Sequence, residues 1–222
     1  MTGSQALVIG ASGGIGGALA VELSARGLEV TRLSRSGNQL DLASQSSVDR
    51  LLSPLDGPFD IILVAAGVLA PGGGRPEKSL AEIEAEAMLE VMAVNAVGPA
   101  LVLRHVPRLL PRHGRCVVAV LTARVGSIGD NRMGGWYAYR ASKAAANQIV
   151  HTAAIEIGRK NAQAIVVALH PGTVDTAFTQ AYRQHPKVSP ETAARNLIDC
   201  ISGLRPEDTG GFFDYAGKPV PW

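Results

Sequence analysis

Short runs of apolar residues alternate along the chain with longer segments in which apolar residues recur every three or four positions. The short runs contain almost no polar residue, which is the pattern of β-strands that are covered on both faces of a sheet. These runs predict strands at Ala6–Gly10, Leu28–Ser34, Phe59–Gly67, Arg115–Thr122 and Ala164–His170, with a last short strand in the sequence GGFFD that ends at Asp214.

The longer segments predict helices between these strands. One segment, Glu82–Leu110, forms one or two helices and is broken or kinked near Gly98-Pro99, because proline has no amide hydrogen. The other predicted helices are Gly14–Gly27, the stretch SSVDRLLSP that begins with hydroxyl caps and stops at Pro54, Tyr137–Arg159 and Ser189–Ser202; Pro71–Ser79 is the clearest flexible loop. This alternation predicts a single α/β domain over residues 1–222, with a doubly wound parallel sheet flanked by helices.

The composition agrees with one globular domain. The 222 residues are 46% hydrophobic and 18% charged, and the formal net charge is +2. A net charge this small does not indicate a nucleic-acid partner, and no apolar run approaches the roughly 18 residues of a membrane helix. The first residues have the pattern of a strand and not of a signal peptide. Cys116 and Cys200 fall in apolar stretches, as buried thiols do. We therefore expect a cytoplasmic protein without a membrane or nucleic-acid partner.

A glycine-rich turn, GASGGIGG, joins the first predicted strand to the first predicted helix. A backbone without Cβ atoms at Gly10, Gly14 and Gly16 can approach a pyrophosphate, and the helix start offers free N–H groups and a positive dipole end. The alternative is that the glycines serve only close packing of strand and helix. The position of the turn, at the first strand-to-helix crossover, favours a dinucleotide site.

The end of the second predicted strand distinguishes between the two nicotinamide dinucleotides. An acid there would hydrogen-bond the adenosine ribose of NAD(H) and repel a 2′-phosphate. This chain has Ser34 and Arg35 instead, with Arg32 close by, and a hydroxyl and a guanidinium suit a phosphate. The alternative is a solvated basic surface. The sequence favours NADP(H), with NAD(H) possible. Asp41 could meet the adenine edge, or it could be a plain helix-capping acid.

The stretch WYAYRASK, which begins at Trp136, contains Tyr139 and Lys143 four positions apart, so a helix places them on one face. A free tyrosine titrates near pH ~10, which is too high for an efficient base at neutral pH. A nearby ammonium favours the phenolate and lowers that pKa. The pair therefore fits acid/base chemistry. Tyr137 has Ala141 in the equivalent place, which indicates packing or pocket lining.

Four stretches together resemble the short-chain dehydrogenase/reductase family: GASGGIG, Asn95 within VMAVNAVGPALV, YRASK, and HPGTVDT from His170 to Thr176. The resemblance covers nearly the whole chain, and the segments around RVGSIGDNRMGGWYAYRASK and GGFFDYAGKPVPW look like the C-factor-like branch of that family. It implies the Rossmann-type sheet already indicated by the pattern.

The resemblance also implies roles for individual residues. Tyr139 is the acid/base, Lys143 holds the nicotinamide ribose hydroxyls, and Asn95 holds a helix backbone and a relay water. Pro171 and Gly172 shape the turn beside the nicotinamide. The expected cofactor-binding residues are Gly10, Ser12, Gly14, Ile15, Gly16, Ser34, Arg35, Asp41, Ala66, Gly67, Tyr139, Lys143, Pro171, Gly172 and Thr173, and no metal site is predicted.

This chain departs from the family pattern at the substrate-binding serine. That serine commonly precedes a glycine by three residues, and with Gly126 as that glycine the matched position is Ala123, which cannot donate a hydrogen bond. Thr122 is the preferred replacement and the fourth predicted catalytic residue. Ser127 is the second choice, and the absence of any hydroxyl is the third. His170 is expected to be a hydrogen bonder at a strand end and not a catalyst.

Two functions remain open from the sequence. The preferred one is an NADP(H)-dependent oxidoreductase that interconverts a small carbonyl and an alcohol. The other is a dinucleotide-binding sensor or signalling protein with weak or no turnover, which Ala123 and the C-factor-like resemblance would fit. A lid is expected at Phe178–Val188. The long helices form dimer and tetramer faces in the family, which implies a homodimer or homotetramer.

Overall fold

Six strands form one parallel sheet in the order β2-β1-β3-β4-β5-β6. The computed structural model describes residues 3–180 and 186–222. The strands are β1 (Gln5–Ile9), β2 (Glu29–Leu33), β3 (Ile61–Val64), β4 (Cys116–Leu121), β5 (Ala164–His170) and β6 (Phe212–Asp214). The chain leaves β1 toward β2 and then crosses back to β3 on the other side of β1. The carboxyl ends of β1 and β3 therefore form the switch point where such sheets bind ligands.

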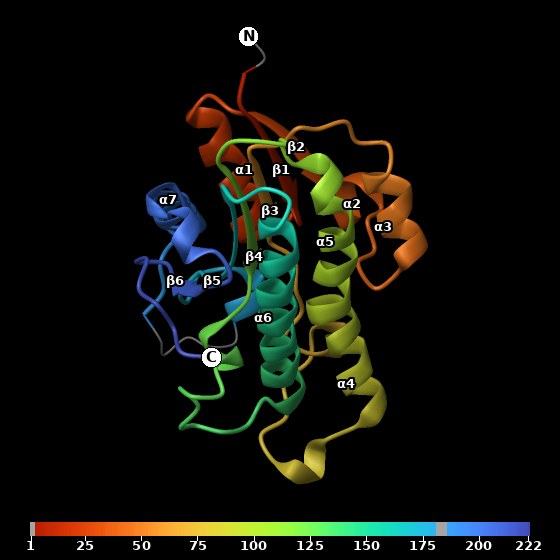
Figure 1. Ribbon diagram of the computed structural model, residues 1–222. Coiled ribbons are helices and arrows are strands. Elements are labelled where there is room, and N and C mark those ends of the chain that lie inside the picture. Colours follow the sequence, from red (N-terminus) through yellow and green to blue (C-terminus); the bar gives the residue numbers. More distant parts are fainter. Residues whose placement is uncertain (1–2, 181–185) are drawn as a thin grey trace.

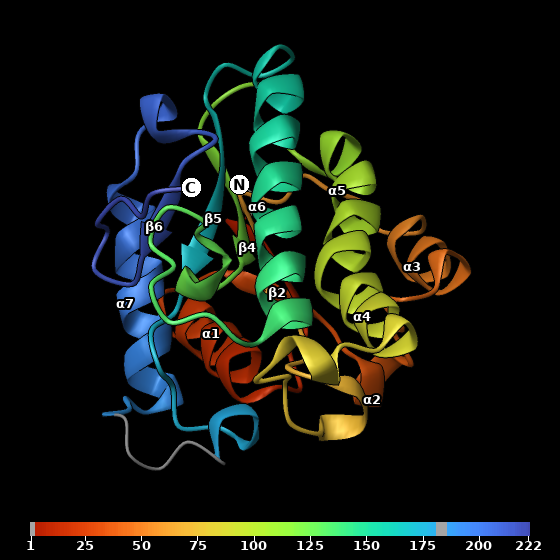
Figure 2. The ribbon, with the colours of Figure 1, turned by 90° about the horizontal axis from the view of Figure 1, so that it is seen from below.

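Helices cover both faces of the sheet, as Figures 1 and 2 show. The helices α1 (Gly14–Ala25) and α7 (Pro190–Gly203) pack together on one face, and α3 (Gln45–Leu52), α5 (Gly98–Leu109) and α6 (Tyr137–Gly158) lie on the other. Shorter pieces complete the chain: α2 (Arg35–Asn38), α4 (Ala85–Met92), η1 (Pro71–Gly73), η2 (Leu80–Glu82), η3 (Ala93–Val97), η4 (Arg124–Gly126), η5 (Ala177–Thr179) and η6 (Pro206–Asp208). The predicted class, a single α/β domain with a Rossmann-type sheet, is confirmed.

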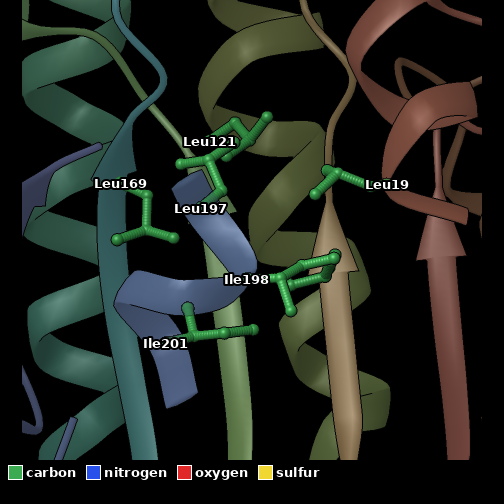
Figure 3. A pocket seen from close by; sticks show the side chains of 7 residues that line it. Leu19, Leu121, Leu169, Leu197, Ile198 and Ile201 are labelled. Carbon is green, nitrogen blue, oxygen red and sulfur yellow. The ribbon is translucent and has the colours of Figure 1, made fainter. Parts of the chain in front are cut away.

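Side chains alternate between two buried clusters along each central strand. On β4, Val118 and Val120 face α5 and α6, whereas Ala119 and Leu121 face α1 and α7. Figure 3 shows the second layer, where Leu197 and Ile198 of α7 lie over the strands in one apolar layer with Leu121 of β4 and Leu169 of β5. No water-sized space remains among these side chains. This layer is therefore apolar core and not a binding site.

The long helical segment differs from its prediction. From Ala85 to Leu109 it is continuous, and the irregularity is a π-helical segment, η3, that ends just before the predicted break at Gly98-Pro99. Pro99 lies in the first turn of α5, where a missing N–H disturbs least. A π segment shifts the helix register by one residue and is a frequent feature of functional sites. Here it contains Asn95.

This continuous segment is long and apolar enough to cross a membrane, with a mean hydropathy of 1.5 over its best window. No segment long and apolar enough to cross a membrane was predicted from the sequence. Core helices of globular domains pass the same test, and in this fold the segment packs against α6 and contributes Val102, Val106 and Leu109 to the core. The absence of a membrane partner stays a prediction.

The remaining differences concern short polar segments. Ser34, predicted as the end of a strand, caps the unpredicted helix α2. The predicted loop Pro71–Ser79 includes the short helix η1 and buries Pro76 and Glu77. Part of the predicted lid, residues 181–185, lies outside the described residues. The two cysteines are free thiols, as predicted, with Cys116 buried and Cys200 half-buried.

Candidate active site

The glycine turn after β1 lies close to the backbone of the neighbouring strand end, at distances that leave no room for Cβ atoms. Gly10 has φ +90°, and a Cβ there would lie 2.8 Å from the carbonyl carbon of Ala65 at the end of β3. A Cβ on Gly16 would lie 2.2 Å from the carbonyl oxygen of Gly10. These two glycines let the turn fold back against the neighbouring strand end. The turn therefore sits at the switch point of the sheet.

The start of α1 is open to an anion. No side chain caps this helix, and Ser12 and Gly14 are exposed while Ile15 is half-buried. Its first N–H groups are available to a phosphate. A Cβ on Gly14 would lie 2.6 Å from Cγ2 of Thr176, so the segment after β5 comes back over the turn. The residues present thus fit the pyrophosphate of a dinucleotide. The turn after β1 and the segment after β5, which were both predicted to line the dinucleotide site, meet here.

The residues after β2 are arranged around helix α2. The Ser34 hydroxyl accepts the N–H of Gly37 at 3.0 Å and caps that helix. Arg35 follows it, and its exposed side chain makes no hydrogen bond or ion pair within residues 3–180 and 186–222. Asp41 is exposed and accepts the N–H of Ala43 at 2.9 Å in the turn before α3. Ser44, and not Asp41, caps α3, so the capping alternative for Asp41 is wrong. The guanidinium of Arg35 is therefore exposed after β2, and its role in recognising a 2′-phosphate stays a prediction.

Asn95 is completely buried and joins three elements. Its Oδ1 accepts the N–H of Val68 at 2.8 Å, and its Nδ2 donates to the Val68 carbonyl at 2.7 Å and to Ser142 Oγ at 3.0 Å. A Cβ on Gly67 would lie 3.1 Å from Asn95 Oδ1 and 3.2 Å from Lys143 Nζ. The loop after β3, which includes Ala66 and Gly67, is therefore held directly against α6.

Tyr139 and Lys143 lie together on the first turns of α6, and both are almost fully buried. Lys143 Nζ is 5.7 Å from the centre of the Tyr139 ring and donates to the Leu121 carbonyl at 3.1 Å. Burial raises the pKa of the Tyr139 phenol above its ordinary value, and burial lowers the pKa of Lys143 to about 8. Desolvation thus opposes the expected lowering of the Tyr139 pKa by Lys143. A phenol kept protonated is suited to giving a proton to a carbonyl oxygen.

Two aromatic rings flank Tyr139. Trp136 meets it edge-on at 6.1 Å between ring centres, and Phe178 of η5 lies tilted at 5.9 Å. Phe178 belongs to the predicted lid and is partly exposed. No role was predicted for Trp136 from the sequence, because its position depends on an unusual backbone conformation with φ +56°.

Glu77 is a buried residue that the sequence analysis missed. Its backbone carbonyl accepts the N–H of Trp136 at 2.6 Å, and its carboxylate accepts the N–H of Ala138 at 3.4 Å. Glu77 therefore caps the start of α6, two residues before Tyr139. The only sequence signal was a single acid in a stretch rich in glycine and proline.

The candidate hydroxyls at the end of β4 are both enclosed. Thr122 is 3% exposed, and its Oγ1 has no hydrogen-bond partner in the part of the chain that the structure describes. Ser127 is 2% exposed, and its Oγ accepts the N–H of Asp130. Ala123, at the family's serine position, is buried as well. The choice among Thr122, Ser127 and no hydroxyl stays a prediction.

The turn after β5 completes the site. Gly172 has φ +78°, and a Cβ there would lie 2.9 Å from the ring of Tyr215. Pro171 and Gly172 are half-buried, and Thr173 is exposed. His170, directly before them, has a pKa lowered to about 4, chiefly by burial. The structure thus brings the predicted residues from β1, β3, α6 and β5 to one edge of the sheet.

A buried tyrosine–lysine–asparagine cluster and an open glycine turn both lie at the carboxyl edge of the sheet, an arrangement that fits the class of dinucleotide-binding proteins. The family model described as short chain dehydrogenase matches residues 4–187. The protein belongs to the short-chain dehydrogenase/reductase family and is an oxidoreductase of that family.

Relatives cover most or all of the chain. It is 32% identical over 235 residues to 1-hydroxy-2-glutathionyl-2-methyl-3-butene dehydrogenase of Rhodococcus sp. (strain AD45), covering 99% of this chain and 100% of the relative. It is 36% identical over 169 residues to C-signal of Myxococcus xanthus, covering 75% of this chain and 94% of the relative. A putative short-chain dehydrogenase/reductase from Burkholderia multivorans with bound NADP superposes with a TM-score of 0.82 at 25% identity, covering 99% and 100% of the two chains.

Proposed function

We propose that the protein reduces a small carbonyl compound to an alcohol with NADP(H), using Tyr139 as the acid/base. The observation that carries this proposal is the convergence of Tyr139, Lys143 and Asn95 in one buried cluster at the carboxyl edge of the sheet. The relative that is named a dehydrogenase over the full chain supports the reaction class. The test is carbonyl-dependent oxidation of NADPH by the purified chain, with the alcohol identified as product.

The dinucleotide would lie across the switch point. The open start of α1, with Ser12, Gly14 and Ile15, would hold the pyrophosphate, and Ala66 and Gly67 would line the path past β3. The turn Pro171–Thr173 would face the nicotinamide. When bound, the nicotinamide supplies the hydride that a carbonyl carbon accepts.

Each polar residue of the cluster then has a separate task. The Tyr139 phenol hydrogen-bonds the carbonyl oxygen and delivers its proton to that oxygen as negative charge develops there. Lys143, fixed to the Leu121 carbonyl, holds a positive charge beside the phenol. Asn95 fixes the loop after β3 against α6, the helix that carries Tyr139. The rings of Trp136 and Phe178 exclude water from the phenol.

We infer a preference for NADP(H) over NAD(H) from Arg35, whose free guanidinium follows β2. The bound NADP in the Burkholderia multivorans structure supports this preference. Arg35→Asp should shift the ratio of kcat/KM for NADPH to that for NADH by about 10²-fold toward NADH, because it removes charge-assisted hydrogen bonds and adds a repelling carboxylate.

The cofactor ratio is measured by steady-state kinetics with each dinucleotide at saturating carbonyl. Arg195→Asp is the matched control, since it makes the same charge change at an exposed position on α7. An Arg35→Asp ratio equal to that of the control would remove Arg35 from phosphate recognition.

A second function has specific support. Ala123 lacks the family's substrate hydroxyl, and one of the relatives is named C-signal. Both fit a dinucleotide-binding sensor with weak turnover. Tight NADPH binding without oxidation on any carbonyl would favour this second function.

We also propose that the protein forms a homodimer or homotetramer and is located in the cytoplasm. Both proposals rest on the family resemblance and the sequence.

A further inference from the structure

Two enclosed polar atoms at the carboxyl edge of the sheet have no partner in the described ranges: Thr122 Oγ1 and His170 Nδ1. Thr122 directly follows β4, and His170 is the last residue of β5. The ladder between these strands pairs Leu121 with Leu169, and the Thr122 N–H donates to the Leu169 carbonyl at 2.8 Å. Thr122 and His170 are therefore the next pair in register.

The two side chains also share a face of the sheet. Val120 lies two residues before Thr122, and Ala168 lies two residues before His170. Both belong to the cluster under α5 and α6. Leu121 and Leu169 belong to the opposite cluster. Because side chains alternate along a strand, Thr122 and His170 both project toward α6, the helix that carries Tyr139 and Lys143. The Lys143 ammonium is bonded to the Leu121 carbonyl at this strand end.

A buried hydroxyl and a buried ring nitrogen are costly without hydrogen bonds, so such atoms almost always find a partner. No hydrogen bond joins the two atoms as they stand in the structure. Their neighbouring places in the β4–β5 register would let a small side-chain rotation or one enclosed water join them. Burial keeps His170 neutral at physiological pH, with one N–H and one lone pair. The charged groups that act on it are Asp214, which raises its pKa, and Arg124, which lowers it.

We propose that the Thr122 hydroxyl donates to His170 Nδ1 and so holds the imidazole in the Nε2–H tautomer, which binds the carbonyl oxygen of the substrate. This assignment rests on the proposed carbonyl reduction. Ala123 cannot supply a donor and the Thr122 hydroxyl is enclosed, whereas His170 is only half-buried and directly precedes the Pro171-Gly172 turn. His170 is then the catalytic residue that replaces the family serine, and Thr122 is a positioning residue.

Three substitutions of His170 distinguish the roles of its two ring nitrogens, Nδ1 and Nε2. Glutamine places an amide N–H near the Nε2 position, asparagine places one near the Nδ1 position, and leucine supplies none. With NADPH and the fastest of benzaldehyde, hexanal and cyclohexanone, His170→Leu and His170→Asn should lose about 10²-fold in kcat, as for other oxyanion donors. His170→Gln should stay within about tenfold of wild type, and NADPH affinity should not change. Unchanged turnover in His170→Leu, or a more active His170→Asn than His170→Gln, overturns the assignment.

The role of Thr122 is tested by its coupling to His170. Thr122→Val should lower kcat about tenfold, whereas Thr122→Ser, which keeps the hydroxyl, should have a kcat close to that of the wild type. In the His170→Leu background, Thr122→Val should cause no further loss of kcat. Full and independent effects of both substitutions would contradict a role for Thr122 through His170. That result would make the Thr122 hydroxyl a direct substrate donor.

A readout without turnover separates this inference from the proposed function. Long-range nitrogen–proton correlation spectra of the wild-type chain should show His170 as the Nε2–H tautomer, and Thr122→Val should mix the two tautomers. The Nδ1–H tautomer in the wild type overturns the pair. If the wild type reduces no carbonyl but the tautomer is as expected, the proposed function fails and the Thr122–His170 pair stands.

Discussion

Tyr139→Phe should lower kcat by about 10²–10⁴-fold and leave NADPH affinity within about twofold of wild type. The substitution removes only the phenolic oxygen. The ring keeps its edge contact with Trp136 and its tilted contact with Phe178, so packing around α6 is retained. What is lost is the proton that the carbonyl oxygen needs as it gains charge. Stopped-flow oxidation of NADPH measures the rate, and fluorescence titration measures the affinity.

The chain supplies its own control for this experiment. Tyr137→Phe removes a phenolic oxygen two residues away on the same helix, from a half-buried side chain that has Ala141 and not a lysine one turn on. It should stay within about threefold of wild type, since it leaves the acid/base group in place. Equal losses in the two variants would remove Tyr139 from the acid/base role.

Asn95→Leu should lower the free energy of unfolding by about 2–4 kcal/mol and abolish turnover. Leucine is similar in volume but cannot bond, so Val68 N–H, Val68 C=O and Ser142 Oγ each lose a partner beside the buried side chain. The loop after β3 is then no longer fixed to α6. Urea unfolding followed by circular dichroism measures the stability change.

Two further variants serve as comparisons for Asn95→Leu. Asn95→Asp keeps an acceptor for the Val68 N–H and should cost less than Asn95→Leu. Asn131→Leu changes an exposed asparagine that accepts only a local N–H and should stay within about 0.5 kcal/mol of wild type. An Asn95→Leu protein as stable as Asn131→Leu would show that the Asn95 bonds contribute little to the fold.

Much of the fold could be predicted because its signals are local. The apolar runs of β4 and β5 are buried on both faces, and the glycine turn after β1 follows directly from a strand and precedes a helix. The spacing of Tyr139 and Lys143 already places them on one helix face. All the predicted strands were confirmed in their order along the chain. The strand β5 has the predicted bounds, β1 is shifted by one residue, and the others are shorter than predicted.

The features that could not be predicted depend on distant segments. Asn95 lies in the π segment, and its side chain bonds to Val68 and Ser142, 27 and 47 residues away. The contact of Phe178 with Tyr139 likewise has no signature in either local sequence.

The same holds for Thr122 and His170. They become neighbours only through the β4–β5 register. The short helix α2 was missed because its four residues carry no apolar periodicity.

The most direct test of the central claim is a single measurement on the purified full chain. NADPH absorbance is followed after addition of benzaldehyde, hexanal and cyclohexanone in turn, and the product is identified by mass. We expect oxidation of NADPH with one alcohol formed per dinucleotide, on at least one of these carbonyls and faster than with NADH. Tight NADPH binding with no oxidation on any of them would contradict the reductase and favour the sensor.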